Sequence, residues 1–148
     1  MSVAFDIMTQ MVADINTAVS AAGLTALTKC EIRRKPVLQK DETGPSAFIT
    51  LMEREREILA TEGLWLKRFV ISITLYTLSD VVKEDETGLD YAEVIEDLYD
   101  AYADLVVTDV DINDVNLVSA PDTPPRFYRV GVDVYKFLYE VEILEDKS

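Results

Sequence analysis

The sequence predicts a single α+β domain over residues 1–148, in which two amphipathic helices pack on one face of an antiparallel (mixed) sheet of about four to five strands. Two segments repeat apolar residues every three or four positions, as helices do, and several others alternate apolar and polar residues, as strands do. These elements follow in the order helix, three strands, helix, two strands. No internal repeat or linker interrupts them, so one domain is expected.

The first helix is expected near residues 3–22, where apolar side chains form a single stripe and polar ones lie opposite. Gly23 is a natural residue to end it. The next stretch, "CEIRRKPVLQ", is predicted to be extended, and Pro36 confines it to an edge or a bulge of the sheet. Residues 41–45, "DETGP", are predicted to form a turn.

A projecting hairpin and a central strand are predicted next. The segment "SAFITLMEREREILATEG" is expected to be a strand that runs into a polar hairpin and turns at Glu62-Gly63. The clearest strand follows over residues 65–78, because apolar and polar side chains alternate there. Its apolar face carries Phe69, Ile71, Ile73 and Leu75.

The second half of the chain is expected to add a helix near residues 90–107 and two final strands. The first of these strands covers residues 114–120. The second runs from Phe127 to Leu144, and its apolar side chains change face near Val134-Tyr135. A β-bulge there, or a strand that passes from one packing partner to another, would explain this change.

The net charge of −14 is unevenly distributed along the chain. Thirteen acidic residues and no basic residue lie between Lys83 and Arg126. The predicted second helix carries part of this charge as an acidic stripe, formed by Glu93, Asp97, Asp100 and Asp104. The sign of the charge excludes direct phosphate binding by this half of the chain. The stripe is interpreted either as a solvated surface that aids solubility or as a surface with a purpose of its own.

Several kinds of catalytic and metal site are excluded by composition. The chain has no histidine, so Ser-His-Asp and Cys-His arrangements are impossible. No glycine-rich phosphate loop is present. Cys30, the only cysteine, is expected to be a small core residue. Residues 109–120 begin like a calcium loop, but Asp114 replaces the required glycine and Ala120 the final glutamate. No catalytic residue, cofactor or metal is therefore expected.

The sequence also bears on the cellular compartment. No apolar run approaches the roughly 20 residues of a membrane helix. The first residues lack a basic region, which argues against a signal peptide, so the cytosol or an equivalent compartment is expected. The short basic clusters "RRK" (33–35) and "KR" (67–68) are interpreted as solvated positions or interface ion pairs, since no aromatic residues alternate with them.

A family resemblance rests on three stretches: "RFVISITLYTLSD", "DYAEVIEDLYDAYADL" and "VNLVSAPDTPPRFYRVGVDVYKFLYEVEI". A central strand that ends in a polar residue, then an amphipathic helix, then a closing strand pair resembles the second half of the tail-terminator and tail-completion proteins of long-tailed bacteriophages. The resemblance is one of architecture and spans most of the chain, with the N-terminal third the weaker part.

The resemblance implies a structural virion protein of the tail or neck, assembled in the host cytoplasm. Such a protein forms a homo-oligomeric, hexameric ring that caps the tail tube and offers a docking face to head connector and neck proteins. DNA passes through the ring without specific binding, and the acidic stripe is expected to face this lumen. Contacts between subunits are expected to involve the projecting hairpin and nearby basic residues, namely Arg54, Arg56, Trp65, Arg33 and Arg34.

Two other functions remain open from the sequence alone. A small acidic protein can mimic DNA and occupy the basic groove of a nuclease or repressor, with carboxylates in place of phosphates. An enzyme that uses a pair of carboxylates is a further alternative, although nothing singles out two of the 28 acidic residues.

Overall fold

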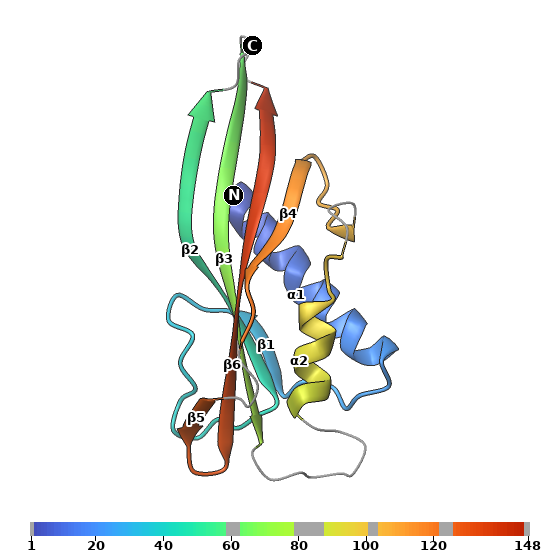
Figure 1. The fold of residues 1–148 in the computed structure, drawn as a ribbon, viewed down its shortest axis with the longest axis vertical. Helices are drawn as coiled ribbons and strands as arrows, with labels where there is room; N and C mark the ends of the chain where they lie inside the picture. Colours follow the sequence, from blue (N-terminus) through green and yellow to red (C-terminus); the bar gives the residue numbers. More distant parts are fainter. Residues whose placement is uncertain (1, 59–62, 79–87, 101–103, 122–125, 147–148) are drawn as a thin grey trace.

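The computed structural model describes residues 2–58, 63–78, 88–100, 104–121 and 126–146. It confirms the α+β class: two helices pack on one face of a mixed sheet, which has six strands rather than four to five (Figure 1). The elements are α1 (Val3–Ala21), β1 (Lys29–Ile32), β2 (Ser46–Ile58), β3 (Leu64–Leu78), α2 (Gly88–Glu96), β4 (Asp111–Ser119), β5 (Arg126–Arg129) and β6 (Val132–Asp146).

The sheet is built around its two longest strands. Its order is β1-β2-β3-β6-β4, and β5 pairs with β6 beside this path. β1 lies parallel to β2 at the edge, and all other pairs are antiparallel. The predicted extended stretch is a strand only as far as Ile32, so Pro36 lies outside it. β3 and β6 pair over their whole length, from Leu64 opposite Asp146 to Leu78 opposite Val132. Figure 1 shows that β2, β3 and β6 extend past both helices as a projecting ribbon.

Helix α1 matches its prediction closely. The Ser2 hydroxyl accepts a hydrogen bond of 3.1 Å from the backbone N–H of Phe5 and so caps the first turn. At the other end Gly23 has a φ of 76°. The N–H of Gly23 donates to the carbonyl of Ser20, and the N–H of Leu24 donates to the carbonyl of Val19. This pattern is the Schellman motif, which satisfies the last carbonyl groups of a helix.

Helix α2 is shorter than predicted, because it ends at Glu96 instead of continuing to residue 107. Its last turn contains no basic residue, and acidic side chains at a helix C-terminus are unfavourable to the helix dipole. The hydroxyl of Tyr139 also donates a hydrogen bond to the carbonyl of Ile95 and lies 3.4 Å from that of Glu96. These carbonyls therefore find a partner in the sheet instead of in a further helical turn.

The predicted strand from Phe127 to Leu144 is two strands, β5 and β6, joined by a turn at Val130-Gly131. Gly131 has a φ of 79°, a conformation that glycine adopts without strain. The change of face near Val134-Tyr135 needs no bulge between β3 and β6, whose register is unbroken. Instead β6 passes from one packing partner to another, which confirms the second of the two explanations.

The two faces of the sheet carry different cores. The helices cover the main core, which contains the apolar face predicted for β3 and the alternating residues of β6 from Tyr135 to Ile143. The opposite face holds a smaller cluster of Leu38, Phe48, Tyr76 and Val132. This smaller cluster is covered by the segment between β1 and β2, residues 33–45, which we call the strapped loop. The sheet therefore stands between the two helices and the strapped loop (Figure 1).

Candidate interaction surfaces

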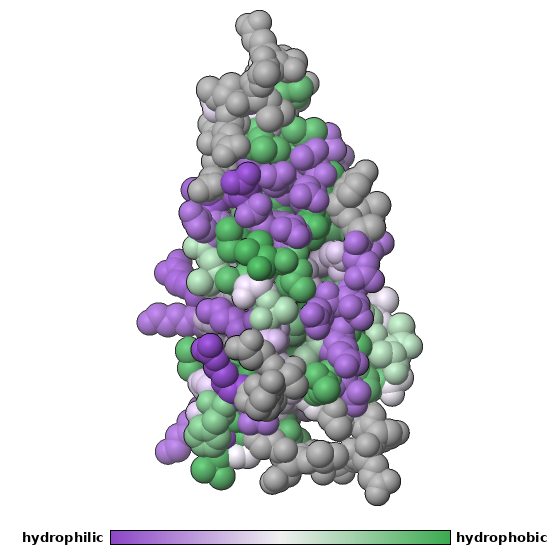
Figure 2. Space-filling model, viewed as in Figure 1, coloured by the Kyte–Doolittle hydropathy of each residue, from purple (hydrophilic) through white to green (hydrophobic). Residues whose placement is uncertain are grey.

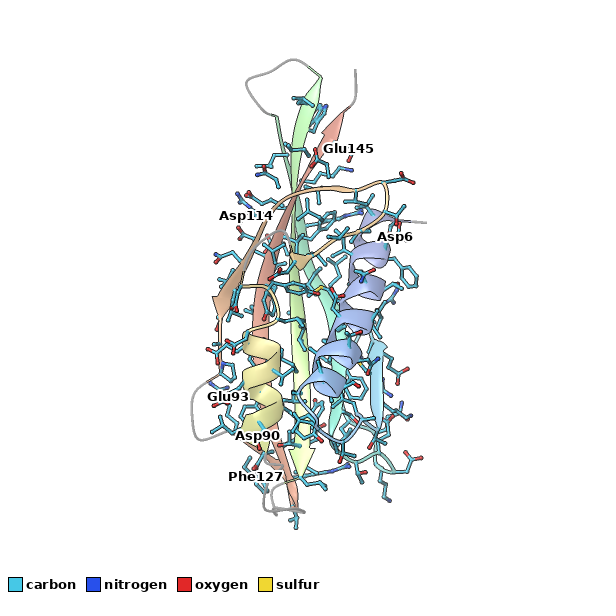
Figure 3. All side chains as sticks on the ribbon, turned by 90° about the vertical axis from the view of Figure 1, so that its right-hand side faces the viewer. Asp6, Asp90, Glu93, Asp114, Phe127 and Glu145 are labelled. Carbon is cyan, nitrogen blue, oxygen red and sulfur yellow. The ribbon has the colours of Figure 1, made fainter. Side chains whose placement is uncertain are left out.

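The predicted acidic stripe is exposed but does not form a row along one helix. Glu93, Asp97, Asp100 and Asp104 all lie on the surface, but only Glu93 belongs to α2. The others follow the helix in turns and irregular structure. In Figure 3, Asp90 and Glu93 of α2 lie on the same side of the view as Asp114 of β4. The carboxylates thus spread over one acidic side of the molecule, formed by α2, the segment after it and β4.

A hollow lies between the end of α1 and helix α2, and sequence analysis did not predict it. Its lining combines an apolar part with carboxylates: Ala22, Leu24, Val94, Asp90, Glu93 and Asp97. It forms because Gly23 ends α1 beside α2. The acidic periodicity indicated the carboxylates, but only the fold brings the end of α1 to them.

The projecting ribbon carries two of the predicted interface residues in described positions. Arg54 is exposed on β2, and Trp65 is half-buried on β3, next to the tip. The side chain of Arg56 lies outside the described residues, as does Glu62 of the predicted turn. The ribbon is a true β2–β3 hairpin, since Ile58 pairs with Trp65.

The basic residues of β3 are held by acids of the same chain. Lys67 forms an ion pair with Glu145. Arg68 bonds to Glu142 at 2.9 Å and to Glu140 at 3.2 Å. These pairs cross from β3 to β6, so they stabilise the ribbon itself. The "KR" cluster therefore consists of intrachain ion pairs in this structure. Figure 2 shows the hydrophilic side chains of the ribbon, with hydrophobic ones between them.

Arg33 is likewise engaged within its own chain. Its guanidinium bonds both oxygens of Glu42, at 2.5 and 2.8 Å, and reaches Glu31 at 2.7 Å. It also stacks over the ring of Phe48, 3.9 Å from the ring centre. The Glu42 side chain is only 5% exposed, and Lys29 adds a further ion pair at 2.6 Å. Bonds from Arg33 and Lys29 and from the N–H of Gln39 hold the pKa of Glu42 well below its usual value.

The neighbouring basic residues of the strapped loop differ from Arg33. Arg34, Lys35 and Lys40 are all exposed. Residues 33–40 contain four basic residues and no acidic one. Arg33 and Arg34 are adjacent in sequence, yet Arg33 fastens the loop to the sheet while Arg34 is presented to solvent.

The remaining candidates have structural roles or none. Cys30 is half-buried against the main core, and burial raises its pKa to about 11, so it is a poor nucleophile at neutral pH. Asp109, the first residue of the rejected calcium loop, has a φ of 62°.

Within the described ranges, no group of metal-ligating side chains lies together. No helix among the described residues is long and apolar enough to cross a membrane.

Together these features define a small α+β protein with an acidic side, a basic loop on the opposite face and a projecting β-ribbon. The fold is similar to that of 26 chains in solved structures. One belongs to the virion of a native gene transfer agent particle, with a TM-score of 0.53 and 14% identity, over 94% of this chain and 92% of that chain. At this identity the likeness shows a shared fold. No protein-family model matches the sequence, and no curated protein matches it either.

Proposed function

We propose that the protein is a structural component of a virion, and in particular a tail-terminator or tail-completion protein of the neck region. The observation that carries this proposal is the shared fold with a chain of the gene transfer agent virion, because the match covers nearly all of both chains. The architectural resemblance in the sequence supports the same class independently.

In this proposal the protein forms a hexameric ring, caps the tail tube and provides a face for head connector and neck proteins. The projecting ribbon is the part best shaped to reach such partners, because it extends beyond the helices (Figure 1). Arg54 and Trp65 lie on it. The assembled protein belongs to the tail or neck of the virion and is put together in the host cytoplasm.

The acidic side faces the lumen through which DNA passes. Asp100 and Asp104 continue from α2 toward β4, while Glu93 and Asp97 border the hollow beside α1 and so stand at the edge of this surface. Carboxylates repel phosphates and release no counterions on contact with DNA, so DNA slides without being retained. This use explains why no basic residue balances the carboxylates.

A second candidate is a DNA mimic, which the spread of exposed carboxylates from Glu93 to Asp114 favours. A mimic binds a basic DNA-binding protein and has no need to close a ring. The two functions differ in their partners and in their oligomeric state.

Sedimentation and negative-stain imaging of the purified protein test the proposal. We expect rings with a central channel that become more abundant at higher protein concentration. Magnesium should favour them, since it neutralises carboxylates that converge on the lumen. A strict monomer that binds no purified tail tube, at any protein or magnesium concentration, would contradict the ring. Tight binding of that monomer to a basic nuclease or repressor would establish the mimic.

A further inference from the structure

The strapped loop is irregular in backbone but tightly fastened to the sheet. Its ends are anchored by the Arg33–Glu42 pair and by the Thr50 hydroxyl, which donates to the carbonyl of Arg33 at 2.7 Å. In its middle the Tyr76 hydroxyl donates to the carbonyl of Pro36. Near its return to β2, Gly44 lies so close to β3 that a Cβ there would be 2.5 Å from the backbone oxygen of Tyr76.

The final strands fasten the loop as well. Arg129 donates to the carbonyls of Gln39, at 3.2 Å, and of Glu42. The loop is therefore held by β2, which follows it directly, and by β3 and β5, which are far from it in sequence. An irregular segment of this length is uncommon in a compact domain unless it has a function, and holding it rigid reduces the entropy lost on binding.

The fastened loop presents cations to solvent. Arg34, Lys35 and Lys40 are exposed, and no ion pair joins them to another described residue. The first part of the loop, residues 33–40, thus offers a fixed, positively charged surface on a protein whose net charge is −14, and the exposed Asp41 follows it.

A complementary surface lies on the other face of the sheet. The hollow between α1 and α2 carries Asp90, Glu93 and Asp97 around an apolar part formed by Ala22, Leu24 and Val94. Residues 88–121 contain nine acidic residues and no basic one. The apolar part suits the aliphatic stems of arginine and lysine, and the carboxylates suit their charged ends.

We propose that the strapped loop of one copy docks into the hollow of the next copy, with Arg34 and Lys35 facing Glu93 and Asp97. The proposal rests on the proposed ring and names the two surfaces that join its subunits. Each copy then contributes its loop to one neighbour and its hollow to the other. Asp100 and Asp104 stay outside this contact and remain available to the lumen.

The position of the two surfaces determines the symmetry. A two-fold dimer needs both complementary surfaces on one side of the molecule, because each copy must give and receive in the same contact. Here the sheet separates loop from hollow, so the contact is head-to-tail, and a head-to-tail contact either closes into a ring or continues as a filament. A second copy is also a better partner for the strapped loop than nucleic acid, since the field of a strongly acidic protein repels phosphates.

Two charge-reversed variants test the contact at one fixed, near-physiological ionic strength. The first is Arg34→Glu with Lys35→Glu, and the second is Glu93→Lys with Asp97→Lys. Each alone should associate more than about tenfold more weakly than the natural sequence, because like charges face each other in the contact. An equimolar mixture should recover association, since each variant then finds opposite charges on the other. Sedimentation measures the association, and circular dichroism verifies folding.

A matched control reverses two exposed cations outside the loop, Arg126→Glu on β5 with Lys136→Glu on β6, and should leave association nearly unchanged. If a reversed pair fails to fold, Arg34→Ala with Lys35→Ala replaces it, and a loss of association is still expected. Rings that form equally well from every variant would overturn the docking of loop into hollow and leave the ring standing. A natural protein that never associates would instead overturn the ring. A short DNA duplex bound by the natural protein and lost in Arg34→Glu with Lys35→Glu would replace the contact by a nucleic-acid surface.

Discussion

The hydroxyl of Tyr99 donates a hydrogen bond of 2.8 Å to the carboxylate of Asp14, 85 residues earlier, and so ties the segment after α2 to α1. Tyr99 is 7% exposed, and its ring meets that of Tyr139 edge to face. Burial and the neighbouring carboxylate raise the pKa of Tyr99 far above its ordinary value. We expect Tyr99→Phe to lower the free energy of unfolding by about 1–3 kcal/mol, the usual cost of losing a bond to a charged group.

Urea denaturation followed by circular dichroism measures this loss. Tyr128→Phe is the comparison, because the Tyr128 hydroxyl has only uncharged partners, the carbonyl of Leu38 at 3.5 Å and the side chain of Tyr76, so a smaller loss is expected. Equal losses for the two variants would show that the Tyr99 hydroxyl has no special role.

Glu42 should make stability depend on acidic pH. Its pKa in the folded chain is well below the 4.5 of a free carboxyl, so its contribution is complete above pH 4.5 and is lost as the pH falls toward the folded value. We expect Glu42→Gln to lower the melting temperature at pH 7 and to flatten its decline between pH 5 and pH 2. Thermal denaturation at several pH values tests this. Glu31→Gln is the control, since Glu31 is exposed and forms an ion pair with Arg33. If the melting temperature of Glu42→Gln fell as steeply with pH as that of the natural protein, the role of Glu42 would be contradicted.

Gly23 should be needed for its backbone conformation alone. A Cβ at this position would meet no atom within 4 Å, so only the φ of 76° opposes a side chain. We expect Gly23→Ala to cost about 1–2 kcal/mol of unfolding free energy and Gly23→Asn less, because asparagine tolerates this region better. Chemical denaturation distinguishes the two. Equal costs would mean that contacts at the site, and not the backbone, set the penalty.

Trp65 tests the role of the projecting ribbon. If the ribbon makes subunit contacts, Trp65→Ala should remain folded yet fail to associate, as seen by sedimentation and circular dichroism. If the indole only packs on its own sheet, the variant should lose stability and still assemble. Unchanged assembly would remove Trp65 from the interface.

Asp100 and Asp104 test the lumen. Replacing both with lysine adds positive charge to the proposed channel, so rings should retain DNA, and retention should fall as salt is added. Filter binding of a DNA duplex to assembled rings measures the effect. Ala13→Lys with Thr17→Lys adds charge to exposed positions of α1 and should have no such effect. Lysine-bearing rings that still ignore DNA would show that these two residues do not face the channel.

Much of the fold could be predicted because local signals agreed with it. The start and end of α1 follow from its apolar stripe and Gly23, and β3 follows from its alternation. The end of α2 could not be predicted, because it depends on Tyr139, which lies more than forty residues away in sequence. The β5–β6 turn was missed since Gly131 has only valine on either side and no second turn residue signals a break.

The surfaces were predicted less completely, for a similar reason. The acidic residues were recognised from their number, but their arrangement as one stripe assumed a longer helix. The different roles of Arg33 and Arg34 could not be read from "RRK", because Glu42 reaches Arg33 only through the path of the strapped loop. Contacts that depend on the route of an irregular segment have no periodic signal in the sequence.

The full-length pairing of β3 with β6 has a consequence for how the protein is made. β6 is the last strand, and its residues pair with partners that precede them by as many as 82 positions, from Leu64 to Asp146. During synthesis on the ribosome, β3 emerges long before the strand that must lie beside it. The centre of the sheet therefore cannot close until β6 has emerged, and the edge of β3 that pairs with β6 is exposed until then. Chains that stop before β6 should be the species that aggregate, and subunits should become competent for association only once β6 has paired with β3.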